Sequence, residues 1–187
     1  MAHIQVTEGM PGILGLIDFR PHTGNILQSL VHTLLRGESP LSAAERELIA
    51  AYVSEKNDCF FCANGHAAAA RYLYKEDAPM VDEVLNNEDV SISEKLKTLL
   101  AIAGKVQNGG KAVTEQDIAA AKSLGATDIE IHDTVLIAAA FSMYNRYVDG
   151  LASYTPTRPE VYAKMGKILG HFGYIRISHD HVPEYLV

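Results

Sequence analysis

The chain has 187 residues, and its 16 Lys and Arg residues against 23 Asp and Glu residues give a net charge of −7 with histidine neutral. Such a charge disfavours binding to the phosphate backbone of nucleic acids and to anionic membrane surfaces. A hydrophobic content of 48% with 21% charged residues can fill a core, which excludes disorder over most of the chain. The longest nearly apolar stretch, 135–144, is about half the length of a membrane span, and no signal-peptide pattern opens the chain. We therefore expect a soluble, cytoplasmic protein with a single domain, 1–187.

Turn and capping signals divide the chain into helices, and almost nothing has the alternation typical of a strand. Ser42 and Glu45 have capping-box spacing, and Pro159 suits the first turn of the last helix. The ends, 1–24 and 173–187, show no clear period, so we expect peripheral arms there. The fold class is therefore all-α. The expected helices cover 25–36, 42–56, 59–74, 78–86, 93–106, 114–124, 127–152 and 159–170.

Segments 42–85 and 93–136 align without a gap at a constant offset, and 12 of the 44 aligned positions are identical. An internal repeat of this kind predicts two copies of a three-helix unit, packed about a pseudo-twofold axis. Because alanine-rich helices also align by chance, two similar sets of helices without common origin remain the alternative.

The two segments differ at the positions that carry reactive side chains. Cys59, Cys62, His66 and Glu47 all belong to the first segment, and their counterparts in the second are Gly110, Val113, Asp117 and Thr98. Copies of one unit keep what the core needs and differ where only one copy performs chemistry. The difference predicts one site per chain.

The spacing of Cys59, Cys62 and His66 suits redox chemistry. At about 100° per residue, the three positions fall within a stripe about 60° wide on one helix. The first turn of that helix favours a thiolate at Cys59, and His66 lies one turn beyond Cys62, where it can exchange a proton with it. Two thiols three residues apart can attack a substrate, oxidise and close a disulfide without refolding.

Other interpretations of these residues stay open. The cysteines can be two small buried apolar residues, or half of a zinc site completed by His66 and by His179 or His181. A thioredoxin fold is excluded, since no βαβ pattern surrounds the pair. The same cysteines would also serve a non-catalytic redox sensor or metal-binding protein, or be incidental in a helical interaction module.

Two polar groups outside the stripe are also ambiguous. Glu47 lies at the edge of the apolar face of its helix, beside alanines. These small side chains allow another helix to approach and to bury the carboxylate in part. The alternative is a glutamate exposed to solvent. Asn145, Arg146 and Asp149 interrupt the apolar part of the long helix. Arg146 and Asp149 can form an ion pair, and a structural role is the favoured interpretation.

The pattern Glu47-x11-Cys59-x2-Cys62-x3-His66 resembles the signature of the AhpD-like alkylhydroperoxidases in the carboxymuconolactone decarboxylase superfamily. The stretches LSAAERELIAAYVSEKNDCFFCANGH and FSMYNRYVDGL resemble the peroxidase-related branch, and the resemblance covers roughly 25–170. One departure is Phe61, where better-known members often carry a second histidine.

The resemblance implies an AhpD-like helical bundle, a homo-oligomer (dimer, trimer or hexamer) and reduction of hydroperoxides without a cofactor or metal. It also implies recycling by a dithiol donor such as a lipoyl group or a thioredoxin-like protein. Carried over to this chain, Cys62 would be the peroxidatic nucleophile and Cys59 the resolving thiol, with His66 and Glu47 as the proton relay. Decarboxylation is not expected, because the decarboxylases of the superfamily lack the cysteine pair.

Overall fold

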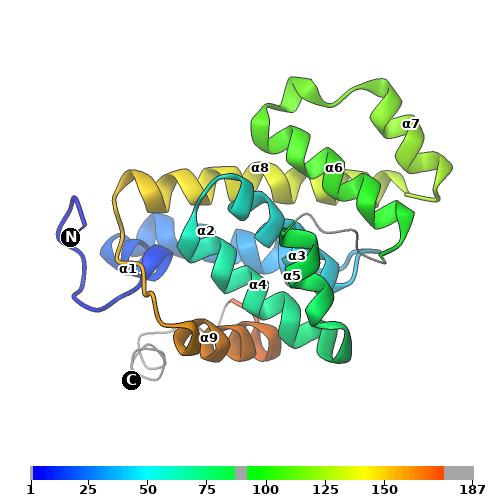
Figure 1. Ribbon diagram of the computed structural model, residues 1–187. Coiled ribbons are helices and arrows are strands. Elements are labelled where there is room, and N and C mark those ends of the chain that lie inside the picture. Colours follow the sequence, from blue (N-terminus) through cyan, green and yellow to red (C-terminus); the bar gives the residue numbers. More distant parts are fainter. Residues whose placement is uncertain (1, 87–91, 175–187) are drawn as a thin grey trace.

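The computed structural model describes residues 2–86 and 92–174, and within these ranges all regular structure is helical, which confirms the all-α prediction (Figure 1). Two short 3₁₀ turns, η1 (Lys75–Asp77) and η2 (Gly110–Ala112), accompany the α-helices. The α-helices are α1 (Gly12–Phe19), α2 (Pro21–Arg36), α3 (Ala43–Lys56), α4 (Phe60–Tyr74), α5 (Pro79–Leu85), α6 (Glu94–Asn108), α7 (Glu115–Ser123), α8 (Asp128–Gly150) and α9 (Pro159–Phe172).

The helices begin where side chains in the sequence can satisfy their free backbone N–H groups. At α3 the Ser42 hydroxyl accepts from the Glu45 backbone N–H at 3.2 Å, and the Glu45 carboxylate accepts from the Ser42 backbone N–H at 2.8 Å. Thr127 and Glu130 form the same reciprocal box at the start of α8. These starts agree with the sequence prediction, because local capping chemistry determines them.

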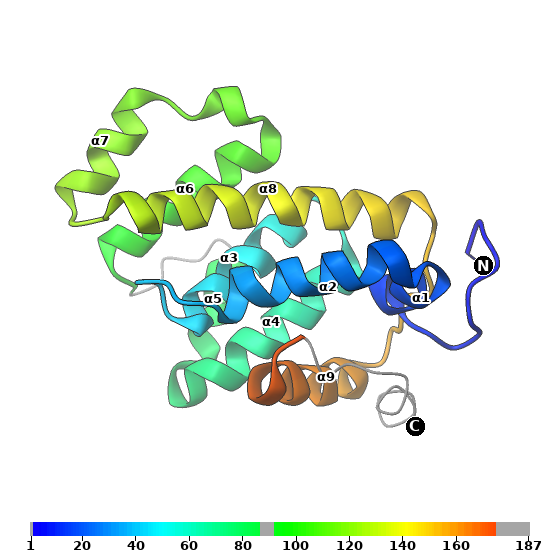
Figure 2. The same ribbon diagram turned by 180° about the vertical axis from the view of Figure 1, so that it is seen from behind.

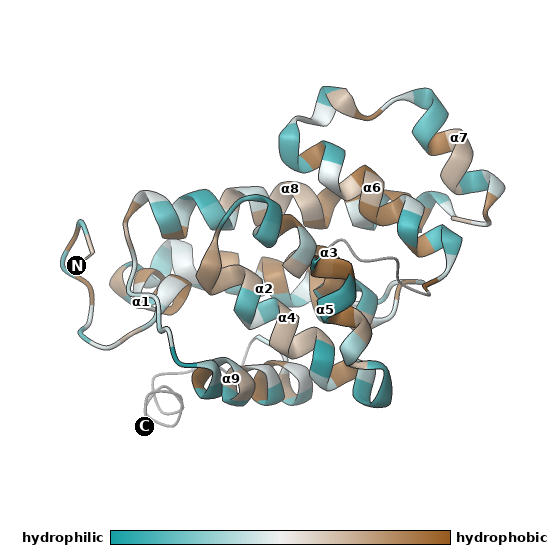
Figure 3. Ribbon diagram, in the orientation of Figure 1, coloured by the Kyte–Doolittle hydropathy of each residue, from teal (hydrophilic) through white to brown (hydrophobic). Residues whose placement is uncertain are grey.

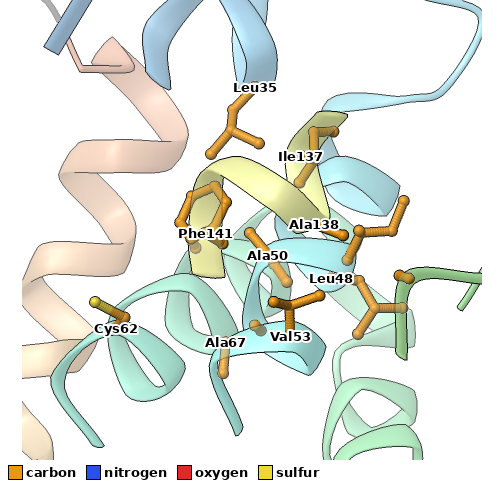
Figure 4. Close-up of a cluster of buried hydrophobic side chains, with 14 of the residues drawn as sticks. Leu35, Leu48, Ala50, Val53, Cys62, Ala67, Ile137, Ala138 and Phe141 are labelled. Atoms are coloured by element: carbon orange, nitrogen blue, oxygen red, sulfur yellow. The ribbon is translucent and has the colours of Figure 1, made fainter. Parts of the chain in front are cut away.

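The core forms where α3 and α4 pack against each other, with α8 across α3 and α9 against the other side of α4 (Figures 1 and 2). Figure 4 shows Leu35, Leu48, Val53, Ile137 and Phe141 meeting there, with small alanines between the helices and Cys62 at the edge of the cluster. The helices alternate hydrophilic and hydrophobic positions along their length, as amphipathic helices around one core do (Figure 3).

The close contact between α4 and α9 depends on a glycine. A Cβ atom at Gly166 on α9 would lie 2.5 Å from the backbone carbonyl carbon and oxygen of Ala68 on α4. Only a residue without a side chain allows this approach. It brings α9, and the residues that follow it, close to the helix that carries the two cysteines.

The prediction of a peripheral arm at 1–24 is wrong for its second half, which forms the partly buried α1 and the first turn of α2. Leu16 is 1% exposed, and Met10 and Leu14 are also buried. The helix is hard to predict because it begins after Pro11 with no side-chain cap, and its run GILGLIDF contains a second glycine and an almost continuous apolar sequence. Packing against α2 and α8, rather than a local signal, supports it.

At the other end, only the first two residues of the expected arm 173–187 are described, and the rest lies outside the described residues. Tyr174 is buried rather than peripheral, at 7% exposure. Within 2–86 and 92–174, each helix falls short of the length or the apolar character that crossing a bilayer requires.

Candidate active site

The two cysteines lie at the start of α4, directly after the tight turn that joins it to α3. Asp58 makes this turn with a φ of 55°, in the left-handed region that aspartate tolerates better than most residues. Cys59 is the N-cap residue of α4, one position before the first turn in which it was expected, and its backbone N–H donates to the Ser54 carbonyl at 3.0 Å. Both thiols are free and buried, with 0% exposure at Cys59 and 4% at Cys62.

Contact between the thiols controls the ionisation of Cys62. The hydrogen bond with Cys59, and then burial, raises the pKa of Cys62 well above its usual range, whereas a hydrogen bond from Asn145 acts in the opposite direction. The positive helix end is therefore not enough to keep Cys62 ionised at neutral pH. A base near its sulfur is needed for attack on a substrate.

Asn145 on α8 is buried at 1% exposure and also holds the turn before the cysteines. Its amide nitrogen donates to Ser54 Oγ at 3.0 Å, and its oxygen accepts from Asn57 Nδ2 at 2.9 Å. The Asn57 oxygen in turn accepts from Gln107 Nε2 on α6 at 2.9 Å. This chain of amides fixes the α3–α4 turn to two other helices, so Asn145 supports the position of the cysteines as well as the polarity around Cys62.

Arg146 and Asp149, which the sequence allowed to pair with each other, are exposed and have different partners. Arg146 Nη1 donates to the Ser142 carbonyl of its own helix at 2.8 Å. Asp149 instead makes a hydrogen bond with Cys59, and partial burial of its carboxyl group raises its pKa. The long helix thus contributes a carboxylate beside one thiol and an amide beside the other.

Glu47 on α3 is fully buried, which excludes the alternative of a solvated glutamate. Its Oε1 accepts from Arg36 Nη2 at 2.6 Å and from the Tyr174 hydroxyl at 2.7 Å, and its Oε2 lies 2.7 Å from His66 Nδ1. Burial by itself would raise the pKa of Glu47, but His66, followed by Arg36 and Tyr174, lowers it below its ordinary value. The carboxylate is therefore ionised and fully occupied by donors.

His66 lies on α4 one turn after Cys62, and its ring is held by aromatic side chains as well as by Glu47. It meets Phe141 edge-on, with ring centroids 4.5 Å apart, and stacks on Tyr174 at 6.0 Å. In the neutral ring the Nδ1–H donates to the carboxylate, which leaves the lone pair of Nε2 free to accept a proton.

A cavity of about 70 Å³ adjoins the site, and its wall is almost wholly apolar. Cys62 and His66 both contribute to this wall, whereas Cys59 is fully buried outside it. A small substrate in the cavity would reach the sulfur of Cys62 first. The other lining residues are Ile13, Leu14, Ile17, Leu27, Gln28, Val31, Phe61, Gly65, Phe141, Tyr144, Met165, Leu169 and Tyr174.

The zinc alternative finds no ligand set in the described part of the chain, where no three His, Cys, Asp or Glu side chains are grouped to hold a metal ion. His179 and His181, which would complete such a set, lie outside the described residues.

The family model of the carboxymuconolactone decarboxylase family matches residues 21–90, the segment that contains Glu47, both cysteines and His66. An uncharacterized peroxidase-related protein from Silicibacter sp. TM1040 is similar over 79% of this chain and 77% of its own, with 29% identity and a TM-score of 0.72. A second structure, an alkylhydroperoxidase AhpD core described as an uncharacterized peroxidase-related protein from Ralstonia eutropha JMP134, has 25% identity and a TM-score of 0.74 over 84% of this chain and 81% of its own.

The chain has an AhpD-like fold. The family model and the two structures make it similar to peroxidase-related proteins of the carboxymuconolactone decarboxylase superfamily, which confirms the resemblance seen in the sequence. No curated protein matches the chain.

The AhpD-like site contains polar residues that sequence reasoning missed. Arg36 and Tyr174 both bind Glu47 but lie 11 and 127 residues away from it in the chain. The only signal for Arg36 was its place at the end of a helix face that also carries Gln28 and His32, and the segment of Tyr174 had no periodic signal at all.

Proposed function

We propose that the chain reduces organic hydroperoxides with the Cys59–Cys62 pair and is recycled by a dithiol donor. One observation carries this proposal: the Cys62 thiol lines an apolar cavity together with His66, whose Nδ1 is 2.7 Å from the buried carboxylate of Glu47. A cavity of this kind accepts the apolar end of a hydroperoxide, and the adjoining base serves a thiol that is protonated at neutral pH.

In the first step His66 Nε2 takes the proton of the Cys62 thiol, and the thiolate attacks the terminal oxygen of the hydroperoxide. The S–O bond forms as the O–O bond breaks, and the leaving alkoxide takes the proton back from His66 to give an alcohol. The sulfur is thereby oxidised by two electrons to a sulfenic acid. Glu47 stabilises the transient imidazolium.

In the second step Cys59 attacks the Cys62 sulfenic acid, which forms the disulfide and releases its hydroxyl as water with the proton of the Cys59 thiol. The hydrogen bond between Asp149 and Cys59 places a carboxylate where it can receive that proton first. A dithiol donor then reduces the disulfide through a mixed disulfide and is itself oxidised. A lipoyl group or a thioredoxin-like protein has the required chemistry.

The test measures consumption of cumene hydroperoxide with dihydrolipoamide as reductant. We expect Cys62→Ser to lose all turnover, because no thiol is left on the cavity wall. Cys59→Ser should still react once and leave a sulfenic acid that a dimedone probe traps. Full turnover by Cys62→Ser would contradict the proposal, and a disulfide that forms but is never turned over by a dithiol would favour a redox sensor instead.

A homo-oligomer is a further part of the proposal. Ile129, Leu136 and Met143 on α8 are 57%, 40% and 44% exposed, and their spacing of seven residues places them on one face of the helix. Light scattering at several protein concentrations should give a mass above 20.4 kDa. A cytoplasmic location stays a prediction from the sequence.

A further inference from the structure

Tyr174, which follows the last helix, is held from one face of α2. Its backbone N–H donates to His32 Nδ1 at 3.2 Å, and its carbonyl accepts from Gln28 Nε2 at 2.7 Å. The Arg36 guanidinium lies over its ring, 5.4 Å from the centroid. These three residues of α2 are spaced by four, so they share one side of the helix. In Figure 2 the chain leaving α9 turns toward α2.

The residue before Tyr174 makes this approach possible. Gly173 has a φ of 70°, and a Cβ atom there would lie 2.9 Å from the His32 ring and 3.2 Å from the Arg36 side chain. Burial, followed by the charge of Arg36, lowers the pKa of His32, which keeps the ring neutral so that Nδ1 can accept. Backbone and side chains therefore combine to hold Tyr174 in one place.

The hydroxyl of Tyr174 is directed at the pair of residues proposed to move protons. It donates to Glu47 Oε1 at 2.7 Å and lies 3.1 Å from His66 Nδ1, while its ring is inclined by only 22° to the imidazole. Burial, followed by the charge of Glu47, raises the pKa of Tyr174 well above its usual range, so it stays a donor. A phenylalanine would fill nearly the same volume, and the hydroxyl is therefore what the site gains.

We propose that Tyr174 is a positioning residue of this site: by its hydrogen bond to Glu47 and its stacking on His66, it holds the imidazole with the proton on Nδ1 and the Nε2 lone pair available to the Cys62 thiol. The effect of Tyr174 on turnover rests on the proposed function, but its effect on the His66 ring does not. Among the described residues, the charged and titratable groups that act on Glu47 are Arg36 from α2, His66 from α4 and Tyr174 after α9, with Arg46 also in electrostatic contact; Cys62 acts on Tyr174.

The test substitutes Tyr174→Phe, which keeps the ring and removes only the hydroxyl. Because Glu47 loses a donor to its ionised form, we expect the acidic limb of the kcat/KM profile for cumene hydroperoxide to move to higher pH. The loss at neutral pH should be about tenfold, the equivalent of one hydrogen bond to a charged group.

A second readout is independent of turnover. The ¹⁵N spectrum of the histidine rings, with the His66 signals assigned through His66→Gln, should show the Nδ1–H tautomer in the wild type and a mixture of tautomers in Tyr174→Phe. The matched control is Tyr74→Phe at the end of α4, since the buried hydroxyl of Tyr74 has no hydrogen-bond partner among the described residues. It should leave both the pH profile and the spectrum unchanged.

An unchanged His66 spectrum in Tyr174→Phe would overturn the proposal, and so would an unchanged acidic limb or a change confined to thermal stability. If the wild type consumes no hydroperoxide with any dithiol, the proposed function fails. In that case the tautomer of His66 alone decides whether Tyr174 positions the ring.

Discussion

The two aligned segments of the chain have the same order of helices, but the first is more buried and the second is more exposed to solvent. In the first, α4 follows α3 and buries eight of its residues between α3 and α9; in the second, α7 follows α6 and buries only Ala121. Both segments begin with a serine cap, at Ser42 and Ser93. Common origin of the two segments stays a prediction. The comparison shows that a shared helical pattern does not determine how deeply each helix is buried.

Residues at corresponding positions bond to near neighbours in the chain in the second segment, whereas in the first they also bond to residues far away in the chain. Asp117, the counterpart of His66, caps its own helix and pairs with Lys105, and the hydroxyl of Thr98, the counterpart of Glu47, bonds back to its own helix. A site forms in the first segment because α2, α9 and Tyr174 cover it with mostly apolar side chains. The two segments therefore differ because other parts of the chain bury one of them, more than because their helical patterns differ.

The largest loss of stability is expected where the first segment buries an ion pair. Arg36→Met removes the cation paired with the fully buried Glu47, and breaking such a pair costs about 3–5 kcal/mol of unfolding free energy. Urea unfolding at neutral pH measures it. Lys105→Met, which breaks the solvated pair with Asp117 in the second segment, is the control and should have little effect. Equal losses in the two variants would show that the first segment is no better enclosed than the second.

Close packing in the first segment gives the next effect. Gly166→Ala forces a methyl group against the Ala68 backbone and should destabilise the protein by about 1–3 kcal/mol or more, because the clash is with backbone and α9 must move. Gly110→Ala, at the position that corresponds to Cys59, meets no atom within 4 Å and should change stability by less than about 0.5 kcal/mol. Thermal unfolding of both variants checks this, and a neutral Gly166→Ala would be evidence against the close contact.

Acid titration sharpens the comparison at Glu47. Because the pKa of Glu47 is held below its ordinary value of 4.5, the ionised carboxylate stabilises the fold fully above that pH, and this stabilisation is lost as the pH falls through the lower value. Glu47→Gln lacks this contribution, so its unfolding free energy should be lower at neutral pH but fall less on acidification to about pH 3. Glu55→Gln, on an exposed position of α3, should retain the wild-type dependence. Parallel curves for Glu47→Gln and the wild type would rule out a buried, ionised Glu47.

The smallest effect tests what the two segments share. Ser42→Ala and Ser93→Ala each remove a hydroxyl that accepts a backbone N–H at 3.2 Å, and each should cost about 1 kcal/mol of unfolding free energy. Ser42 also belongs to a reciprocal box with Glu45, so its loss should be slightly the larger. A loss of unfolding free energy in only one of the two variants would show that the serine caps at the start of both segments are coincidental.

Local chemistry made much of the fold predictable from the sequence. The caps at Ser42 and Thr127, and Pro159 in a first helical turn, gave helix starts that agree with the structure. The first helix escaped prediction because tertiary packing, not a cap or a period, defines it. In the site, the helical stripe and the family signature pointed to Cys59, Cys62, His66 and Glu47, but Tyr174 was missed, since no local pattern encodes a contact across 127 residues.

The most direct test of a single redox site in the first segment is the intact mass of the chain before and after one equivalent of cumene hydroperoxide. A two-thiol reaction predicts the loss of two hydrogens, with both cysteines no longer titratable, and full recovery on adding a dithiol. An unchanged mass with both thiols still titratable, while the hydroperoxide is consumed, would contradict it.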